Sequence, residues 1–160
     1  MPGRQGAVGD RWIRAKPHSP RGLTLGRLVG VVGRNEARGR HVVETIRAAG
    51  GSATFLAADL TSKTAIDRLV KEADETFGLV DILVNNAGIY PLGPTAQVDE
   101  ATFDAVIATN LKGPFFLTAA LLPRMAKRGS GKVINITTGA ALVGILGRRS
   151  MARRRRRSRC

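Results

Sequence analysis

Two amides, an alanine and a glycine, Asn85-Asn86-Ala87-Gly88, follow the apolar run 82–84 directly. This pattern is typical of the carboxyl end of a buried parallel strand, where open α/β sheets bind their ligands. Alanine and glycine let a ligand approach the backbone, and the amides can hydrogen-bond to neighbouring strands. Taken alone, the four residues could equally form a turn after a strand.

Polar residues with possible chemical roles follow other apolar runs. Asp59-Leu60 comes after the run 53–57, and Arg34 comes after the run 28–32. A carboxylate at a strand end can bind a ligand, but it can also cap the next helix. Asn110 lies in the middle of a helical pattern, where asparagine is a poor helix former, and an ordinary polar position remains the alternative. Thr138 follows the apolar run 132–136, where β-propensity alone would explain it.

Strand-like and helical patterns alternate from about residue 28. The sequence predicts strands at 28–32, 53–57, 79–84 and 132–136, and helices at 34–49, 61–77 and 101–127. Thr61 or Ser62 is the expected cap of the second helix. Repeated strand–helix units with continuous apolar strands predict an α/β fold with a Rossmann-like, doubly wound parallel sheet.

Charge is distributed unevenly along the 160 residues. The formal net charge is +14, of which residues 1–27 carry +5, residues 28–147 carry +1 and residues 148–160 carry +8. The middle therefore has the balanced surface of a globular enzyme, and the sequence indicates no sequence-specific nucleic-acid recognition. We divide the chain into a basic segment 1–27, a domain 28–147 and an Arg-rich, disordered tail 148–160.

Other compositional features restrict the environment of the protein. The single cysteine, Cys160, is typical of a reducing, cytoplasmic setting. We expect no membrane span, because no apolar run approaches about 20 residues, and no metal site, because His18 and His41 lack metal-ligand spacing.

The motifs occur in the order found in the short-chain dehydrogenase/reductase family, and residues 28–147 resemble its ketoreductase-like bacterial members. The resemblance implies an NAD(P)-dependent oxidoreductase that transfers hydride between a nicotinamide cofactor and a small carbonyl or alcohol substrate. It places the backbone of Asn86, Ala87 and Gly88 against the adenine ribose side of the cofactor. It also places Asp59 and Leu60 beside the adenine ring.

The same resemblance assigns three further residues. Arg34 lies where the family distinguishes its two cofactors, and an arginine there can pair with a 2′-phosphate, which favours NADP over NAD. Asn110 matches the catalytic asparagine, whose backbone bends the helix and holds a water of the proton relay. Thr138 occupies the position of the catalytic serine.

Two family motifs are absent at their expected places. Residues 1–27 contain no Gly-rich phosphate loop, and the sequence about a dozen residues beyond Thr138 contains no Tyr-x-x-x-Lys. Back-translation in shifted reading frames can yield both motifs, with the tyrosine straddling Ser150 and Met151. We therefore expect a truncated family member, frameshifted at both ends, whose sheet lacks or distorts its first strand.

We expect this chain to be inactive or impaired as an enzyme. Two alternatives are a non-catalytic remnant and a basic nucleic-acid-binding protein that uses its Arg-rich ends. Members of the family usually assemble as homo-oligomers through the long helix that contains Asn110, and the missing elements leave that assembly open here.

Overall fold

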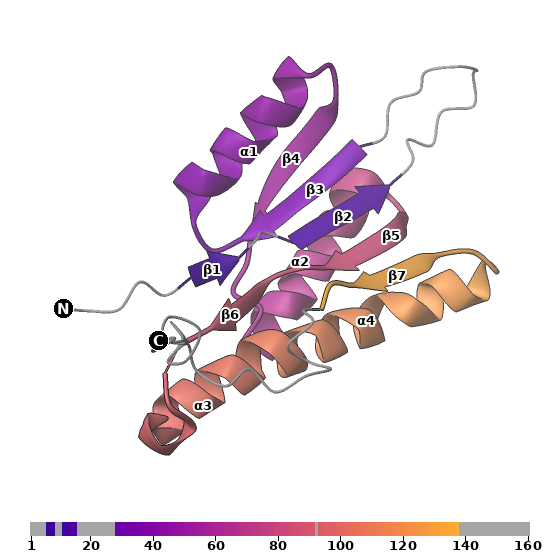
Figure 1. Cartoon of the computed structure of the whole chain (residues 1–160). Helices are drawn as coiled ribbons and strands as arrows, with labels where there is room; N and C mark the ends of the chain where they lie inside the picture. Colours follow the sequence, from indigo (N-terminus) through magenta and orange to yellow (C-terminus); the bar gives the residue numbers. More distant parts are fainter. Residues whose placement is uncertain (1–5, 9–10, 16–27, 92, 138–160) are drawn as a thin grey trace, which may run out of the picture.

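The computed structural model of the chain describes residues 6–8, 11–15, 28–91 and 93–137 (Figure 1). Its main sheet has five strands in the order β4-β3-β2-β5-β7. Four of them run parallel: β3 (Leu28–Gly33), β4 (Ser52–Ala57), β5 (Val80–Asn85) and β7 (Lys132–Asn135). These are the four strands predicted from the sequence, and they confirm the Rossmann-like α/β class.

The fifth strand corrects the expectation of a wholly parallel sheet. β2 (Arg11–Ala15) lies between β3 and β5 and is antiparallel to both. In the usual strand order of a Rossmann sheet this central position belongs to the first strand, which is parallel to its neighbours. The sequence predicted no strand in residues 1–27, because Arg-Trp-Ile-Arg-Ala has neither a continuous apolar run nor strict alternation. Backbone groups of β3 and β5 provide the pairing instead, since an open strand edge pairs with any extended segment.

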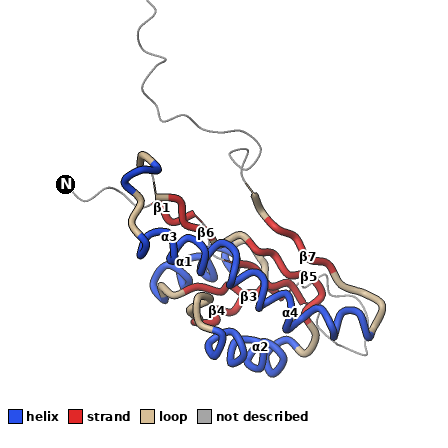
Figure 2. The backbone as a smooth tube through the Cα atoms, turned by 90° about the horizontal axis from the view of Figure 1, so that it is seen from below, coloured by secondary structure: helices blue, strands red, loops and turns tan. Residues whose placement is uncertain are grey.

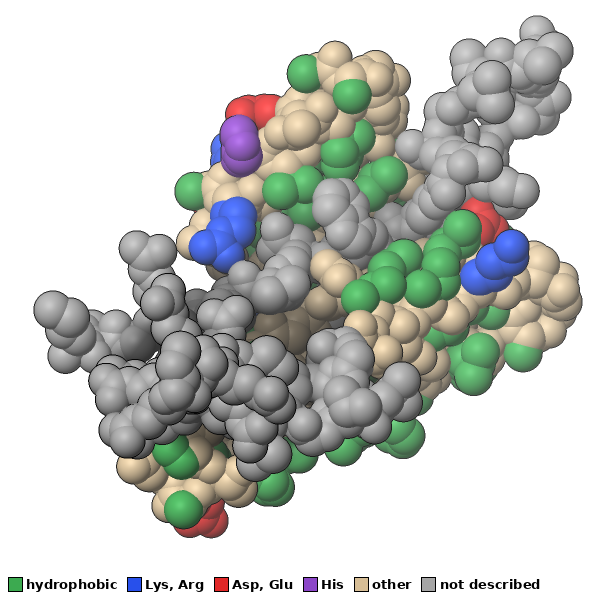
Figure 3. Space-filling view, viewed as in Figure 1, with side chains coloured by type: hydrophobic (Ala, Val, Ile, Leu, Met, Phe, Trp, Pro, Cys, Tyr) green, Lys and Arg blue, Asp and Glu red, His purple; other side chains and the backbone are tan. Residues whose placement is uncertain are grey.

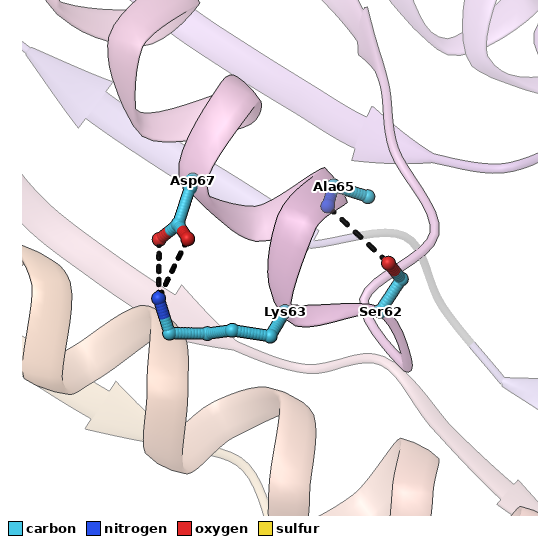
Figure 4. Close-up of polar contacts among 4 residues, drawn as sticks. All are labelled: Ser62, Lys63, Ala65 and Asp67. Carbon is cyan, nitrogen blue, oxygen red and sulfur yellow. Dashed lines mark hydrogen bonds and ion pairs between the residues drawn. The ribbon is translucent and has the colours of Figure 1, made fainter.

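Three helices begin at side chains that accept a hydrogen bond from the first turn. The four α-helices of the described residues are α1 (Glu36–Ala48), α2 (Lys63–Phe77), α3 (Glu100–Ile107) and α4 (Gly113–Lys127), and the first three have such a cap. Asn35 caps α1, Ser62 caps α2 and Asp99 caps α3, each through the backbone N–H three residues on. Of the two caps proposed for α2, Thr61 and Ser62, the structure selects Ser62 (Figure 4).

The sheet buries apolar side chains on both faces. Val31 packs with Val43 of α1, whereas the next residue, Val32, packs with the side chains of α2 and α4. Adjacent residues of a strand point to opposite faces, so this change of partner shows that helices cover both faces. The arrangement confirms the prediction of a doubly wound sheet.

Two further strands form a small separate sheet. β1 (Gly6–Val8) pairs antiparallel with β6 (Gly88–Tyr90), which begins at the glycine of Asn85-Asn86-Ala87-Gly88. Figure 1 shows this pair at the carboxyl ends of the parallel strands, close to the beginning of β2. A short 3₁₀ turn, Thr95–Gln97, then leads to α3.

The long helix that contains Asn110 is continuous from α3 to α4 and is partly exposed. It has 28 residues, Glu100–Lys127, and an 18-residue window within it has a mean hydropathy of 1.4, so the segment could cross a membrane by length and composition alone. Leu117, Leu121 and Met125 are nevertheless buried against the sheet and α2. Arg124 also forms an ion pair with Asp74 of α2. These contacts make the segment a packing helix of an α/β domain.

Candidate functional site

The candidate site lies at the carboxyl ends of the parallel strands. Arg34 follows β3, Asp59 lies two residues after β4, and Asn86 follows β5. The strand order reverses between β3 and β5, which is the switch point where open α/β sheets bind their ligands. The structure therefore brings the residues predicted from three separate motifs to the same end of the sheet, at the carboxyl ends of its parallel strands.

Asn85 ties the end of β5 to two neighbouring elements. Its side-chain Nδ2 donates hydrogen bonds to Oδ1 of Asn135 in β7 at 2.8 Å and to Oγ1 of Thr118 in α4 at 3.3 Å. Asn85 is 5% exposed, and its Oδ1 has no donor among the described residues. A buried acceptor of this kind costs free energy unless a hydrogen-bond donor reaches it. The predicted role of these amides in joining strand ends is thus seen at Asn85.

Asn110 fastens the chain that follows the Asn85-Asn86-Ala87-Gly88 segment. Its Oδ1 accepts a hydrogen bond from the backbone N–H of Ile89, and its Nδ2 donates to the carbonyl of Ile89, both at 2.9 Å. A Cβ placed on Gly88 would lie 3.4 Å from Asn110 Oδ1, so this side chain and the glycine backbone lie close together. Asn110 positions the polypeptide directly beyond the proposed cofactor contacts.

The helix around Asn110 is a π-turn over Ala108–Lys112. Pro114 has no N–H, so the ordinary α-helical hydrogen bond to the carbonyl of Asn110 cannot form. The backbone N–H of Gly113 instead donates to the carbonyl of Ala108, five residues earlier. The predicted irregularity at Asn110 is therefore present, and the signal for it that our sequence reasoning missed is Pro114.

Asp59 uses one oxygen to organise the loop before α2. Its Oδ1 accepts hydrogen bonds from the backbone N–H of Thr61 at 3.0 Å and from the Thr61 hydroxyl at 2.8 Å. These bonds, the backbone one first, hold the pKa of the carboxyl below its ordinary value, and the positive charge of Arg34 contributes in the same direction. The parallel register that pairs Gly33 with Ala57 places these two predicted site residues at neighbouring strand ends.

Leu60 is placed differently from its neighbour. Its side chain is 8% exposed and belongs to the core between the sheet and α2. A ligand at this edge can therefore reach Leu60 only through its backbone. Asn86, Ala87 and Gly88 are half-buried, as expected for backbone that forms the wall of a site.

The stability contributed by Asp59 is expected to depend on pH. A carboxyl with a depressed folded-state pKa contributes stability above its unfolded pKa, about 4, and loses that contribution as pH falls through the folded value. Asp59→Asn should therefore lower the melting temperature at pH 7, and the difference should shrink steadily below about pH 4. Thermal melts of both proteins from pH 7 to pH 2.5 measure it; a constant difference would contradict the assigned hydrogen bonds.

Three other residues and the possible metal ligands complete the description of this region. Lys63, directly after the Ser62 cap, pairs with Asp67 one turn along α2, with Nζ–Oδ distances of 2.6 and 2.7 Å (Figure 4). Tyr90, the only tyrosine of the chain, is 53% exposed. Thr138 lies outside the described residues. The described part of the chain contains no cluster of three or more side chains suited to a metal ion.

Comparison with known proteins identifies the class that this site defines. A family model described as short chain dehydrogenase matches residues 20–150. An oxidoreductase of Thermotoga maritima is 41% identical over 111 residues, which are 69% of this chain and 43% of that protein. A 3-oxoacyl-[acyl-carrier-protein] reductase of Staphylococcus epidermidis is 38% identical over 106 residues, 66% of this chain and 42% of the reductase.

Solved structures agree with this assignment. A metagenomic short-chain oxidoreductase in complex with NADP has a TM-score of 0.66 and 38% identity, over 71% of this chain and 51% of the other. A gluconate 5-dehydrogenase from Burkholderia cenocepacia in complex with NADP and tartrate has a TM-score of 0.62 and 30% identity, over 68% and 43%. The chain belongs to the short-chain dehydrogenase/reductase family. It spans about four-tenths of the length of the curated relatives it matches.

The described residues fit one half of a nicotinamide dinucleotide. Arg34 and Asp59 supply a cation and a carboxylate at neighbouring strand ends, and Gly88 brings its backbone close to the side chain of Asn110. β2 is antiparallel to β3 and β5, so its carboxyl end lies at the other end of the sheet from these residues.

Proposed function

We propose that this chain carries the adenosine-binding edge of an NADP-dependent oxidoreductase that interconverts a carbonyl and an alcohol. The observation that supports this most is the pairing of Asn110 with both backbone groups of Ile89, directly beyond Asn86, Ala87 and Gly88. When bound, the cofactor supplies or accepts the hydride. In this proposal the three residues hold the ribose through their backbone, and Asn110 fixes the strand end and its helix for the proton relay, together with Thr138.

The preference for NADP follows from the charges at the adenosine end. Arg34 is exposed at the end of β3, and its charge acts on Asp59. A guanidinium in this position can bind a 2′-phosphate through two hydrogen bonds, whereas a ribose without phosphate offers it only hydroxyl groups. In the proposal Asp59 keeps Oδ1 on Thr61 and presents its other oxygen to the adenine amino group, while Leu60 contributes its backbone.

Replacing Arg34 tests the proposed preference. Arg34→Ala should weaken NADPH binding by about 10- to 100-fold, because a hydrogen bond to a charged group contributes about 1.5–3 kcal/mol. NADH binding should change little. Nucleotide fluorescence titrations measure both, and Arg68→Ala, which removes an exposed arginine from α2, is the matched control for net charge. Equal losses for NADPH and NADH would contradict a 2′-phosphate contact.

We further propose that the chain as written has little or no dehydrogenase activity. Its only tyrosine, Tyr90, is followed by Pro91, Leu92, Gly93 and Pro94, so the sequence offers no Tyr-x-x-x-Lys to donate a proton. Two further features favour a non-catalytic remnant: β2 is antiparallel to its neighbours, and residues 1–27 contain no Gly-rich phosphate loop. Measurable NADPH-dependent carbonyl reduction by the purified chain would overturn this part of the proposal.

The exposed apolar face of the long helix supports a homo-oligomer. Five large side chains on it are 39–64% exposed: Phe103, Ile107, Leu111, Phe115 and Leu122. Figure 3 shows hydrophobic side chains along the lower edge of the molecule, where this helix runs. A contiguous face of this kind is typical of an interface between proteins.

A charge on this face should prevent the assembly. Phe115→Lys should convert the oligomer to monomers at concentrations where the unmodified chain stays associated, because burying an unpaired ammonium group is costly. Sedimentation equilibrium measures the association constants. Thr64→Lys, on the exposed surface of α2, adds the same charge away from the face and should leave association unchanged. A monomeric unmodified chain would refute the proposed interface.

A further inference from the structure

The amino-terminal strand β1 lies on the chain that follows the proposed cofactor contacts. Gly6–Val8 pairs antiparallel with Gly88–Tyr90, with Val8 opposite Gly88 and Gly6 opposite Tyr90. Figures 1 and 2 both show β1 and β6 side by side. Gly88 is the last residue of the segment whose backbone is proposed to contact the cofactor, so the contact places an extended segment of the same chain at the site.

The hydrogen bonds of Asn110 determine which edge of β6 this strand covers. Both backbone groups of Ile89 are bound by Asn110, so they point away from β1. Successive residues of an antiparallel strand point their N–H and C=O groups to alternate edges. Gly88 and Tyr90 therefore face β1, and their pairs with Val8 and Gly6 are the hydrogen-bonded ones. Asn110 therefore binds one side of β6, at Ile89, and Val8 pairs with Gly88 on the other side.

The chain reaches β1 and β2 at the switch point of the sheet. β2 begins at Arg11, only three residues after β1 ends, and Arg11 is opposite Val32 near the carboxyl end of β3. The next residue, Trp12, is opposite Val84 near the carboxyl end of β5. The amino-terminal segment therefore joins the two sheets at the place where a dinucleotide would enter the crevice.

We propose that β1 is an intramolecular inhibitor of dinucleotide binding, which must leave β6 before NADP can occupy the edge at Gly88. The inference rests on the proposed function, since it requires that this edge be the cofactor site. Pairing of Gly6–Val8 and binding of the cofactor are mutually exclusive, so each weakens the other by the same factor. The apparent affinity for NADPH is reduced by the fraction of molecules in which β1 is docked.

Two proline substitutions separate this pairing from other effects of the segment. Val8→Pro removes an N–H that faces Gly88, whereas Ala7→Pro removes one that points away from β6. Both positions lie outside β2. If β1 is docked in about nine molecules of ten, Val8→Pro should tighten NADPH binding by about tenfold, and Ala7→Pro should change it by less than about twofold. A chain without residues 1–8 should match Val8→Pro.

Amide hydrogen exchange provides the readout that is independent of binding. Val8→Pro should accelerate exchange at Tyr90, and saturating NADPH should accelerate exchange at Gly6 and Val8 in the unmodified chain. Equal NADPH affinity in all four proteins would overturn the inhibition while leaving the proposed cofactor site standing. Faster exchange at Tyr90 without NADPH binding by any of the proteins would instead refute the proposed function, and the competition with it.

Discussion

Expression of the gene in a corrected reading frame is expected to raise NADPH-dependent carbonyl reduction by about 10²–10⁴-fold over the chain as written, the range for a positioned proton donor. The shifted frame at Ser150 and Met151 can encode Tyr-x-x-x-Lys at the spacing that the family resemblance requires from Thr138. In that family the tyrosine is the acid or base, and the lysine lowers its pKa and binds the ribose. The described residues already provide Asn110, held on Ile89.

The experiment compares purified proteins with a general carbonyl substrate and NADPH. The corrected protein carries the shifted frame at both ends, and its matched control has phenylalanine in place of the restored tyrosine. The control should fold and bind NADPH like the corrected protein but reduce the substrate about as slowly as the chain as written. If sequencing of the locus finds no frame that encodes Tyr-x-x-x-Lys beside Ser150, the frameshift hypothesis fails before any assay.

The parallel strands and their helices were predictable because their sequence signals are local. The run at 28–32 is continuous and apolar, and the helix after it has Val42, Val43 and Ile46 at helical spacing. Gly50 has a φ of 80°, a conformation that glycine adopts without strain, and it follows the end of that helix as predicted. Such patterns do not depend on the rest of the chain.

β2 was not predictable because its position depends on the unpaired backbone groups of β3 and β5 and not on its own sequence. The sequence Arg11–Ala15 carries no strong strand pattern, and its pairing comes from open backbone edges on β3 and β5. The direction of such a strand follows from chain connectivity rather than from side-chain pattern. The same applies to β1, whose partner, Gly88–Tyr90, is far away in the sequence.

The sequence predicted the residues of the candidate site better than the contacts that those residues make. The motifs gave Asp59 and Asn110, but they did not show that Thr61 would engage Asp59 or that Ile89 would be the partner of Asn110. Those contacts arise between elements, so no local pattern encodes them. Leu60 shows the opposite case, since a residue assigned to the site by resemblance directs its side chain into the core.

Leu117→Ala is expected to destabilise the protein by about 2–5 kcal/mol, the largest stability effect that we predict for a single side chain. Leu117 of α4 is fully buried against the sheet and α2, so truncating its side chain leaves a cavity in addition to the lost apolar contact. Phe115, two residues earlier on the same helix, is 64% exposed and is the matched control. In dilute protein Phe115→Ala should change the free energy of unfolding by less than about 0.5 kcal/mol.

The same two substitutions also test whether the long helix packs on the sheet or crosses a membrane. A helix that crosses a membrane has lipid around it, so the two substitutions would have similar effects on stability. A helix packed on an α/β sheet has one sensitive face and one tolerant face. Urea unfolding of each variant at low concentration measures the difference without a contribution from association. Equal effects of Leu117→Ala and Phe115→Ala would contradict the packing seen at Leu117, Leu121 and Met125, and with it the surface assigned to a second copy of the chain.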